Sequence, residues 1–335
     1  MSIKNNNPEN SIIVEGLWNV GKTSIAQSYC EKFGYTLLSE PMHTHQDEVP
    51  AIKDIDLWYI DQHKKRADLL RDSKKVFSER SILSSFAFLY ALDRPLPDKN
   101  LINYLGDIIQ KNTILIVYMR SEKLVVPKKD INSKVYSEDI QNILENPKAS
   151  LRYENWYNDI LPREYGISPL VVNVTEQEGI SRSVTDMVNE INLVLKCNRI
   201  AQINVVCFAR SQSNADDLQI LVLKRNQQKG GFWQTITGGV HIGENLCNAA
   251  KREVMEEIGL FDDVRLFPAG LSYSFMGDDG YMLKEYVFGC EVSDPSKIQI
   301  SDEHDSFEWM HPQKAVDRVA YENNKQAIDF VIKIR

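Results

Sequence analysis

Short apolar runs alternate with helix-length segments through the N-terminal part of the chain. The runs lie at residues 12–14, 35–39, 76–77, 114–119 and 170–174. The first run is followed by a glycine-containing turn and then by a helical stretch, 22–33, which Gly34 closes. This alternation is typical of a parallel sheet with helices on both faces. The sequence therefore predicts an α/β domain over 11–197, preceded by a flexible, polar N-terminus over 1–10.

The pattern changes near residue 197. Residues 181–196 place apolar side chains at helical spacing, and this pattern stops at Cys197 and Asn198. Strand-like runs follow at 203–208, 220–223, 281–288 and 307–310. One long helix is predicted from about Gln313 to the C-terminus. The sequence therefore predicts a second domain over 198–335.

Composition narrows the class of protein. The chain has 335 residues, a formal net charge of −8 and a pI near 5.4. Nucleic-acid binding depends on clustered Lys and Arg, so no nucleic-acid partner is expected. The five cysteines form no CxxC pair, which is typical of reduced thiols in the cytoplasm. No apolar run approaches the roughly 20 residues of a membrane helix. We expect a cytoplasmic protein that acts on small molecules away from membranes, and a homodimer is left open.

Candidate metal-binding and catalytic residues are most concentrated between residues 238 and 260. Glu253, Glu256 and Glu257 stand at i, i+3 and i+4, so their carboxylates converge on one face of a helix. Hard divalent cations prefer such oxygen ligands. The alternative is a solvated acidic face, because exposed like charges on a helix cost little.

The residues around the three glutamates favour a metal site. Gly238 and Gly239 permit a tight loop before the helix, and Gly259 can end it. Glu244 and Arg252 can pair and hold that loop against the helix. A solvated acidic face would require none of these features.

These residues match the Nudix family motif position for position, and the resemblance covers about 200–335. It implies an α/β/α sandwich with a mixed sheet. It also implies hydrolysis of a nucleoside diphosphate linked to another moiety, with the help of Mg²⁺ or Mn²⁺. By position in the motif, Glu253, Glu256 and Glu257 would bind the metal, and Glu257 would be the principal, catalytic ligand.

Flanking segments are similar to dihydroneopterin-triphosphate and nucleoside-triphosphate pyrophosphohydrolases. The similar stretches are 231–239, Glu303-His304 ahead of Trp309, and 324–328. This resemblance implies that Glu303 is a base or an additional ligand, and a surface acid in a turn is the alternative. Candidate substrate contacts are Lys224 and Arg225 for phosphates, Trp233 or Phe232 for a base, and the loop glycines Gly238 and Gly239. One of the two aromatic residues is expected in the core.

A second phosphate-binding pattern lies at residues 16–23, with the sequence Gly-Leu-Trp-Asn-Val-Gly-Lys-Thr. Gly16 and Gly21 would let backbone N–H groups cradle a phosphate, with Asn19 in the same loop. Lys22 would reach the terminal phosphates and Thr23 would meet magnesium. A predicted strand precedes the pattern and a predicted helix follows it, as a P-loop requires. An ordinary glycine turn is therefore the weaker alternative.

Other segments within 11–196 resemble deoxynucleoside kinases and thymidylate kinases. The resemblance implies ATP as phosphoryl donor, and it implies that Glu40, in Glu40-Pro41, takes the proton of the substrate hydroxyl. Within Glu79-Arg80-Ser81, the acid would lie near magnesium and the arginine at the transferred phosphoryl group. Gln62 would read the base.

The predicted lid departs from this kinase pattern. Residues 122–146 contain Lys123, Lys128, Lys129 and Lys134 but no arginine. An arginine in that place stabilises the charge that moves during phosphoryl transfer. A lysine is a point charge and lacks the bidentate fork of arginine. The sequence therefore supports nucleotide binding more strongly than kinase activity.

The two motifs together predict a bifunctional enzyme of nucleotide metabolism. The C-terminal half would hydrolyse a nucleoside triphosphate-like substrate to monophosphate and pyrophosphate. The N-terminal half would phosphorylate a (deoxy)nucleoside or a nucleoside monophosphate with ATP. The alternative is a Nudix hydrolase regulated by a P-loop module that binds ATP without transferring phosphate. The sequence leaves the base, the sugar and the leaving group open.

Overall fold

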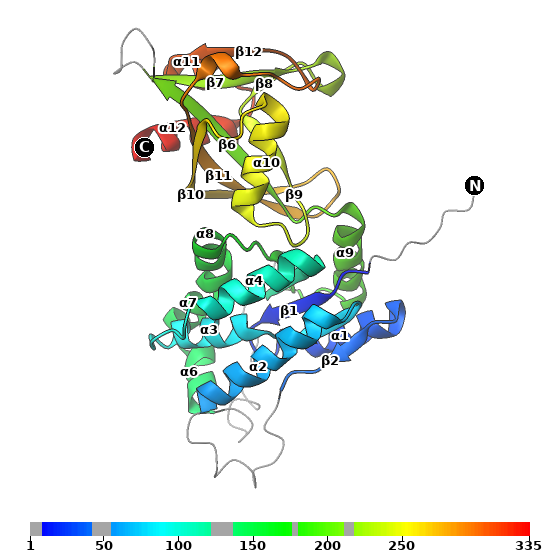
Figure 1. The fold of residues 1–335 in the computed structure, drawn as a ribbon. Coiled ribbons are helices and arrows are strands. Elements are labelled where there is room, and N and C mark those ends of the chain that lie inside the picture. Colours follow the sequence, from blue (N-terminus) through cyan, green and yellow to red (C-terminus); the bar gives the residue numbers. More distant parts are fainter. Residues whose placement is uncertain (1–8, 42–54, 122–136, 176–179, 211–217) are drawn as a thin grey trace, which may run out of the picture. The chain divides into compact units, whose positions relative to one another are not determined.

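The computed structural model describes residues 9–41, 55–121, 137–175, 180–210 and 218–335. The chain divides into two compact units, Met1–Asn198 and Arg199–Arg335 (Figure 1). The lid lysines named above lie outside the described residues. Each unit is considered by itself.

The N-terminal unit is built on a five-stranded parallel sheet. Its strands are β1 (Ile12–Gly16), β2 (Thr36–Leu38), β3 (Val76–Glu79), β4 (Leu115–Arg120) and β5 (Leu170–Asn173). They lie in the order β2-β3-β1-β4-β5, and every pair is parallel. All residues of β1 and β3 are buried, which requires both faces of the sheet to be covered. The predicted parallel sheet is confirmed.

Helices cover this sheet. They are α1 (Lys22–Phe33), α2 (Ile55–Asp72), α3 (Ile82–Ala91), α4 (Asn100–Asn112), α6 (Glu138–Glu145), α7 (Pro147–Asn155), α8 (Leu161–Tyr165) and α9 (Val184–Cys197), with a π-helical turn at Trp156–Ile160. Helix α1 has the predicted bounds because Gly21 and Gly34, at its two ends, both adopt left-handed conformations. Helix α1 packs against α9, and α3 packs against α7.

The strand order places the loop after β1 at a switch point of the sheet. Strand β1 lies between β3 and β4, while the chain leaving β1 passes through α1 to β2 on the far side of β3. In open α/β sheets, ligands bind outside the carboxyl ends of the strands at such a point. The loop after β1 is the predicted P-loop, so the topology puts this motif where a ligand site is expected.

The C-terminal unit contains a seven-stranded mixed sheet. Its strands are β6 (Ala201–Arg210), β7 (Leu218–Arg225), β8 (Trp233–Gln234), β9 (Ile236–Val240), β10 (Val264–Met276), β11 (Met282–Val292) and β12 (His304–Met310). The main path is β10-β11-β6-β7-β12, with β8 paired to β7 and β9 paired to β6. Strands β11 and β6 are parallel, whereas the other pairs are antiparallel. The predicted mixed sheet is confirmed.

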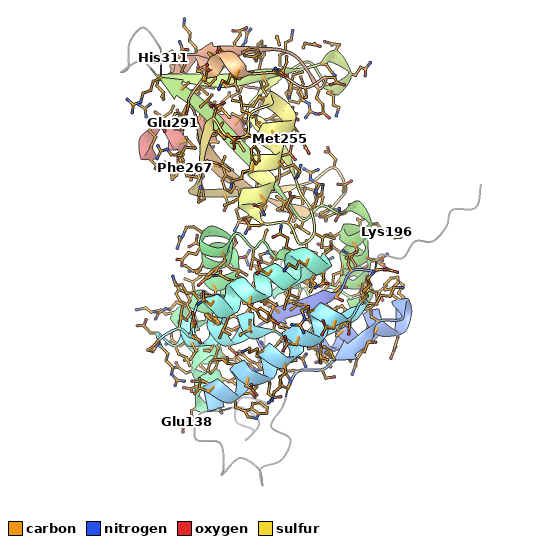
Figure 2. All side chains as sticks on the ribbon, viewed as in Figure 1. Glu138, Lys196, Met255, Phe267, Glu291 and His311 are labelled. Carbon is orange, nitrogen blue, oxygen red and sulfur yellow. The ribbon has the colours of Figure 1, made fainter. Side chains whose placement is uncertain are left out.

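Two helices pack on opposite sides of this sheet, α10 (Leu246–Ile258) and α12 (Glu322–Ile334) (Figure 1). Helix α10 packs against β9 and β6. Helix α12 contributes Ile328 and Val331 to a buried cluster that includes Val206 and Phe208 of β6. Met255 of α10 is exposed (Figure 2), so α10 buries only one side of its surface.

The prediction of a single C-terminal helix is wrong. The segment forms two helices, α11 (Pro312–Arg318) and α12, and Val319 between them is extended. The backbone N–H of Ala320 donates to the carbonyl of Trp233 at 2.9 Å instead of to the preceding helical turn. Val319 itself is buried. Tertiary packing therefore outweighs the helical pattern in this segment.

Among the helices of the described residues, none is long and apolar enough to cross a membrane.

Candidate active sites

The loop before α10 is shaped around one carboxylate. A Cβ atom on Gly238 would lie 1.8 Å from the carboxyl carbon of Glu253. Only glycine leaves room for this carboxylate over the backbone of β9. Glu253 is accordingly buried, and burial raises the pKa of its carboxyl group although Arg252 opposes that shift.

Arg252 ties the loop to the helix, as predicted from the sequence. Its Nε donates to Glu244 Oε1 at 2.9 Å, and its Nη2 donates to Glu244 Oε2 at 3.0 Å. The same Nη2 donates to the Gly239 carbonyl at 2.7 Å. Its Nη1 donates to Glu253 at 2.6 Å and to Glu256 at 3.1 Å. One planar guanidinium therefore fixes the loop and two of the three candidate ligands.

The third candidate ligand, Glu257, is held by residues outside the motif. Ser301 Oγ donates to Glu257 Oε2 at 2.9 Å, and His304 Nε2 lies 2.5 Å from the same oxygen. Burial alone would raise the pKa of Glu257, but His304, Ser301 and Arg225 lower it below its usual value. The carboxylate is therefore ionised at neutral pH. The sequence analysis assigned no role to Ser301 or His304, because their contacts with Glu257 cross 44 and 47 positions of the chain.

The donor set suits a hard divalent cation. Glu253, Glu256 and Glu257 offer carboxylate oxygens from one face of α10, and Mg²⁺ and Mn²⁺ prefer such ligands. The space at Gly238 is filled by one of these carboxylates rather than by a side chain of the loop. Within the described residues, no three His, Cys, Asp or Glu side chains are gathered as tightly as a metal site would require. The three glutamates fit the metal by the chemistry of their carboxylates and by their places in the Nudix motif.

Glu303 faces a different group of side chains. Its Oε2 accepts from Arg225 Nη2 at 2.9 Å, and its Oε1 accepts from Lys229 Nζ at 2.7 Å. Lys224, the neighbouring phosphate candidate on β7, pairs across the sheet with Trp233 of β8. The structure thus brings Arg225 and Glu303 together, and it adds Lys229, which the sequence analysis did not name.

Trp233 packs partly into the protein. Its ring lies against the apolar cluster between the sheet and α12, and the Arg318 guanidinium lies 4.6 Å from the ring centre. Phe232 stacks edge-on against the exposed Tyr321, with ring centres 5.0 Å apart. Of the two aromatic residues, Trp233 is the one that contacts the core.

The predicted P-loop, residues 16–23, adopts the conformations that its glycines permit. Gly16 has φ of +142°, and a Cβ atom there would lie 2.8 Å from the Met119 carbonyl. Asn19 and Gly21 also have positive φ values, of 63° and 87°. Thr23 lies exposed in the first turn of α1, whose N-terminal N–H groups suit an anion. The loop therefore has the sharp turns that an anion cradle requires.

Lys22 is folded back onto its own loop. Its Nζ donates to the carbonyls of Leu17 at 2.6 Å and Gly16 at 3.3 Å. The side chain is buried, and burial together with Arg80 lowers the pKa of Lys22 to about 7. An incoming phosphate would favour the charged ammonium, because a nearby anion stabilises the protonated form.

Arg80 is the centre of the remaining contacts in the N-terminal unit. It is buried, has φ of 66°, and its Nε lies 2.6 Å from Glu40 Oε1. Its Nη1 donates to the Gly16 carbonyl at 3.0 Å and to the Tyr153 hydroxyl at 3.1 Å. The backbone N–H of Glu40 donates to Glu79 Oε2 at 3.2 Å. The structure therefore brings Glu40, Glu79 and Arg80 together at the P-loop.

Glu15 belongs to this site and was missed by the sequence analysis. Its carboxyl group is fully buried and accepts hydrogen bonds from Ser81, Ser84 and Tyr157. Burial raises the pKa of Glu15. A sequence signal existed, since Glu15 is a charged residue inside an otherwise apolar strand.

Gln62 lies half-buried on α2, one residue before the buried His63. None of the contacts described above includes its side chain, so its role as a base reader stays a prediction.

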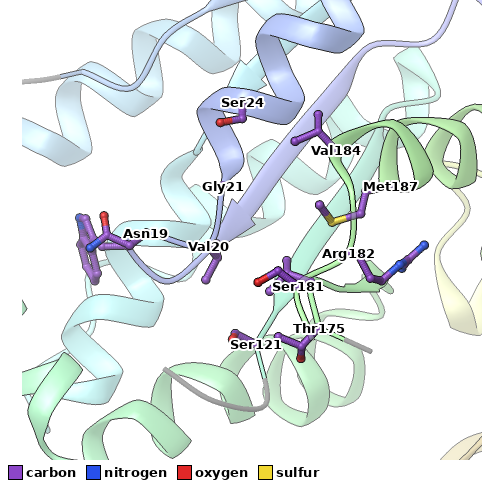
Figure 3. A pocket seen from close by; sticks show the side chains of 12 residues that line it. Asn19, Val20, Gly21, Ser24, Ser121, Thr175, Ser181, Arg182, Val184 and Met187 are labelled. Carbon is purple, nitrogen blue, oxygen red and sulfur yellow. The ribbon is translucent and has the colours of Figure 1, made fainter. Parts of the chain in front are cut away.

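A cavity of about 220 Å³ lies beside the P-loop (Figure 3). The P-loop side contributes Asn19, Gly21 and Ser24, and the opposite side contributes Thr175, Arg182 and Met187. Ser121, just after β4, also lines it. The cavity thus lies between the predicted P-loop and the residues that directly follow β5 and begin α9.

Known proteins resemble the C-terminal unit. Residues 201–331 match the family model of the NUDIX domain. A dihydroneopterin triphosphate diphosphatase from Haemophilus influenzae is 32% identical over 127 residues, which cover 34% of this chain and 78% of that protein. The solved structure of the E. coli dihydroneopterin triphosphate pyrophosphohydrolase is 26% identical, with a TM-score of 0.35, over 40% of this chain and 95% of that chain.

An octanoyltransferase from Myxococcus xanthus is 28% identical over 126 residues, which cover 37% of this chain and 35% of that protein. This chain therefore spans about a third of the length of that relative. The match to the family model, the extent of the match to the diphosphatase and the geometry around α10 agree, and the chain belongs to the Nudix family through the domain in its C-terminal unit.

Proposed function

We propose that the C-terminal domain is a Mg²⁺- or Mn²⁺-dependent pyrophosphohydrolase. The observation that carries this proposal is the single network in which Arg252 holds Glu244, Glu253 and Glu256 around the loop glycines. Such preorganised charge is what a reaction on a phosphoanhydride needs, because negative charge builds up in its transition state.

The residues of the chain have separate tasks in this proposal. Glu253, Glu256 and Glu257 would hold the metal, which when bound polarises the phosphoanhydride and lowers the pKa of an attacking water. Arg252 keeps the loop closed on the helix. Arg225 and Lys229 pair with Glu303, and the charge of Arg225 also acts on Glu257. These two cations would bind the phosphates of a substrate.

The substrate class follows from the relatives and from these cations. The similarity to a dihydroneopterin triphosphate diphosphatase supports a triphosphate attached to a nucleoside or a similar heterocycle. The products would be the monophosphate and pyrophosphate. The proposal treats such small molecules as the partners, and a cytoplasmic location stays a prediction.

Substitution of one ligand tests the hydrolase. We expect Glu257→Gln in the full chain to lower kcat about 100-fold or more, because a fixed charge at the transition state is lost. Pyrophosphate release is measured with dihydroneopterin triphosphate and a panel of nucleoside triphosphates. Glu308→Gln, an exposed acid on β12, is the matched control and should behave like the wild type. Near-normal hydrolysis by Glu257→Gln would contradict the assignment.

A second function is favoured by the P-loop unit. Glu40, Glu79 and Arg80 meet at the loop that carries Lys22, and the cavity of Figure 3 lies beside that loop. A kinase needs a carboxylate near the acceptor hydroxyl and a cation at the transferred group. We propose that this unit binds ATP and phosphorylates a (deoxy)nucleoside or nucleoside monophosphate. The presence of both units in one chain supports related substrates for the two halves.

The alternative is that the P-loop unit binds ATP and only regulates hydrolysis. The absence of arginine from the predicted lid favours this alternative. One more observation is compatible with it, since Arg80 is already paired with Glu40 and bonded to the Gly16 carbonyl.

A screen of phosphoryl acceptors distinguishes the kinase proposal from the regulatory alternative. The full chain is incubated with ATP, Mg²⁺ and a panel of nucleosides and nucleoside monophosphates, while phosphoryl transfer and hydrolysis are both followed. We expect Lys22→Ala to abolish transfer and to spare hydrolysis, because Lys22 is the cation of the loop. Lys32→Ala, at the exposed end of the same helix, is the control. If no acceptor is phosphorylated but ATP alters hydrolysis in a Lys22-dependent way, the unit is a regulator.

A further inference from the structure

The loop before β12 is bound to the last turn of the Nudix helix. The backbone N–H of Gln299 donates to the Ile258 carbonyl at 3.0 Å, and that of Ser301 donates to the Glu257 carbonyl at 3.1 Å. The backbone N–H of His304 donates to the Ser301 carbonyl at 3.1 Å. These bonds give the loop a defined position against the end of α10.

Two side chains of this loop converge on one oxygen of Glu257. Ser301 Oγ and His304 Nε2 lie 2.9 Å and 2.5 Å from Oε2. A carboxylate can only accept hydrogen bonds, so Nε2 of His304 carries the proton in this contact. Two donors use the two lone pairs of Oε2, which leaves Oε1 as the oxygen that can bind a further partner.

The neighbouring residue, Glu303, points to a different group. Glu303 lies in the turn that precedes β12, whereas His304 is the first residue of that strand. Glu303 binds Arg225 and Lys229 and is 42% exposed, whereas the His304 side chain is 1% exposed against Glu257. These separate contacts assign the two residues to different tasks.

We propose that His304, with Ser301, is a positioning residue that holds the Glu257 carboxylate in the orientation that binds the divalent cation. Glu303 instead pairs with Arg225 and Lys229. This inference rests on the proposed hydrolase function. It departs from the family resemblance, which made Glu303 the base or an additional ligand. Residues that orient a metal ligand typically contribute 10–100-fold to metal affinity.

Mn²⁺ binding to the full chain, followed by electron paramagnetic resonance titration, tests the proposal without relying on activity. We expect His304→Leu to weaken Mn²⁺ binding about 10–100-fold. His304→Gln should restore most of the affinity, because the Gln amide can place an N–H donor near the position of Nε2. Glu257→Gln measures the Mn²⁺ binding that remains without the Glu257 carboxylate. The midpoints of unfolding show whether each variant is folded.

Glu303→Gln is the discriminating variant. We expect its Mn²⁺ affinity to stay within about threefold of the wild type, while its KM for a triphosphate changes because Arg225 and Lys229 lose their partner. A loss of Mn²⁺ affinity as large as that of Glu257→Gln would make Glu303 a ligand and overturn the proposal.

The positioning role also fails if His304→Leu binds Mn²⁺ like the wild type while Glu257→Gln does not. Failure of the hydrolase proposal looks different, since the wild-type chain would then hydrolyse none of the triphosphates tested. If His304→Leu does not fold, Ser301→Ala takes its place, with an expected three- to tenfold loss of Mn²⁺ affinity. An unchanged Mn²⁺ affinity in Ser301→Ala would leave this contact with only a structural role, which overturns the proposal.

Discussion

The candidate phosphate sites of the two units are of opposite construction. In the Nudix unit, Arg252 binds Glu244 eight positions away and Glu253 next to it, so one loop and one helix hold the network. In the P-loop unit, Arg80 contacts Gly16 across 64 positions and Tyr153 across 73. The Arg252 network is local in sequence, whereas the Arg80 network exists only when separate strands of the sheet are assembled.

Substitutions in the two sites are therefore expected to have different effects on function and on stability. The Arg252 network is damaged most by a change inside its own loop and helix, because its bonds join residues of those two elements. A site assembled from strand ends is coupled to the stability of the sheet, so that a change there alters folding and ligand binding together. The following substitutions separate these two behaviours.

The largest effect is expected from Gly238→Ala. The new Cβ would lie within about 2 Å of the Glu253 carboxylate and displace it, and a misplacement of about 1 Å at a catalytic group can cost about 100-fold in rate. We expect kcat for hydrolysis to fall about 100- to 1,000-fold. Gly239→Ala is the matched control, because its Cβ would meet only the flexible Arg199 side chain at 3.4 Å. Equal losses in the two variants would disprove the steric argument.

A smaller effect, on stability, is expected from Arg80→Met. Removing this buried cation leaves Glu40 without its ion pair, which typically costs about 3 kcal/mol. The free energy of unfolding, from denaturant titration of the full chain, measures the loss. Arg94→Met breaks the more exposed pairs with Asp139 and Asp56 and should cost below about 1 kcal/mol. If both variants lost the same amount, the P-loop site would not depend on its buried ion pair.

The smallest effect is a pH dependence in the P-loop unit. Burial, with Arg66 and Arg80 nearby, lowers the pKa of His63 to about 3 from an ordinary value of 6.5. Between these values the unfolded chain binds a proton that the folded chain does not, so the stabilising contribution of neutral His63 is lost as pH falls below 6.5. His63→Phe should therefore gain stability relative to the wild type on acidification, by at most about 1.4 kcal/mol per pH unit.

Denaturation of both proteins at pH 7.0, 6.0 and 5.0 measures this difference, and the contributions of all other groups cancel in it. A constant difference across these pH values would mean that His63 has the same pKa in the folded and the unfolded chain.

Several elements could be predicted because their signals are local. Helix α1 has the expected bounds, since a glycine with positive φ stands at each end. Strand β10 was not predicted, because it lies at the edge of the sheet, alternates between exposed and half-buried residues, and contains Pro268 and a bulge. The C-terminal helix was predicted as one because the bond that interrupts it comes from Trp233, far away in the sequence.

The sequence by itself determined the two phosphate motifs and the residues within them, including the pairing of Glu244 with Arg252. Each motif is confined to one loop and one helix, so spacing alone sets which side chains meet. Only the tertiary structure decided that His304 rather than Glu303 faces Glu257, and that Arg80 is paired with Glu40. Those contacts join residues that are distant along the chain, and packing of the sheets, not spacing, brings them together.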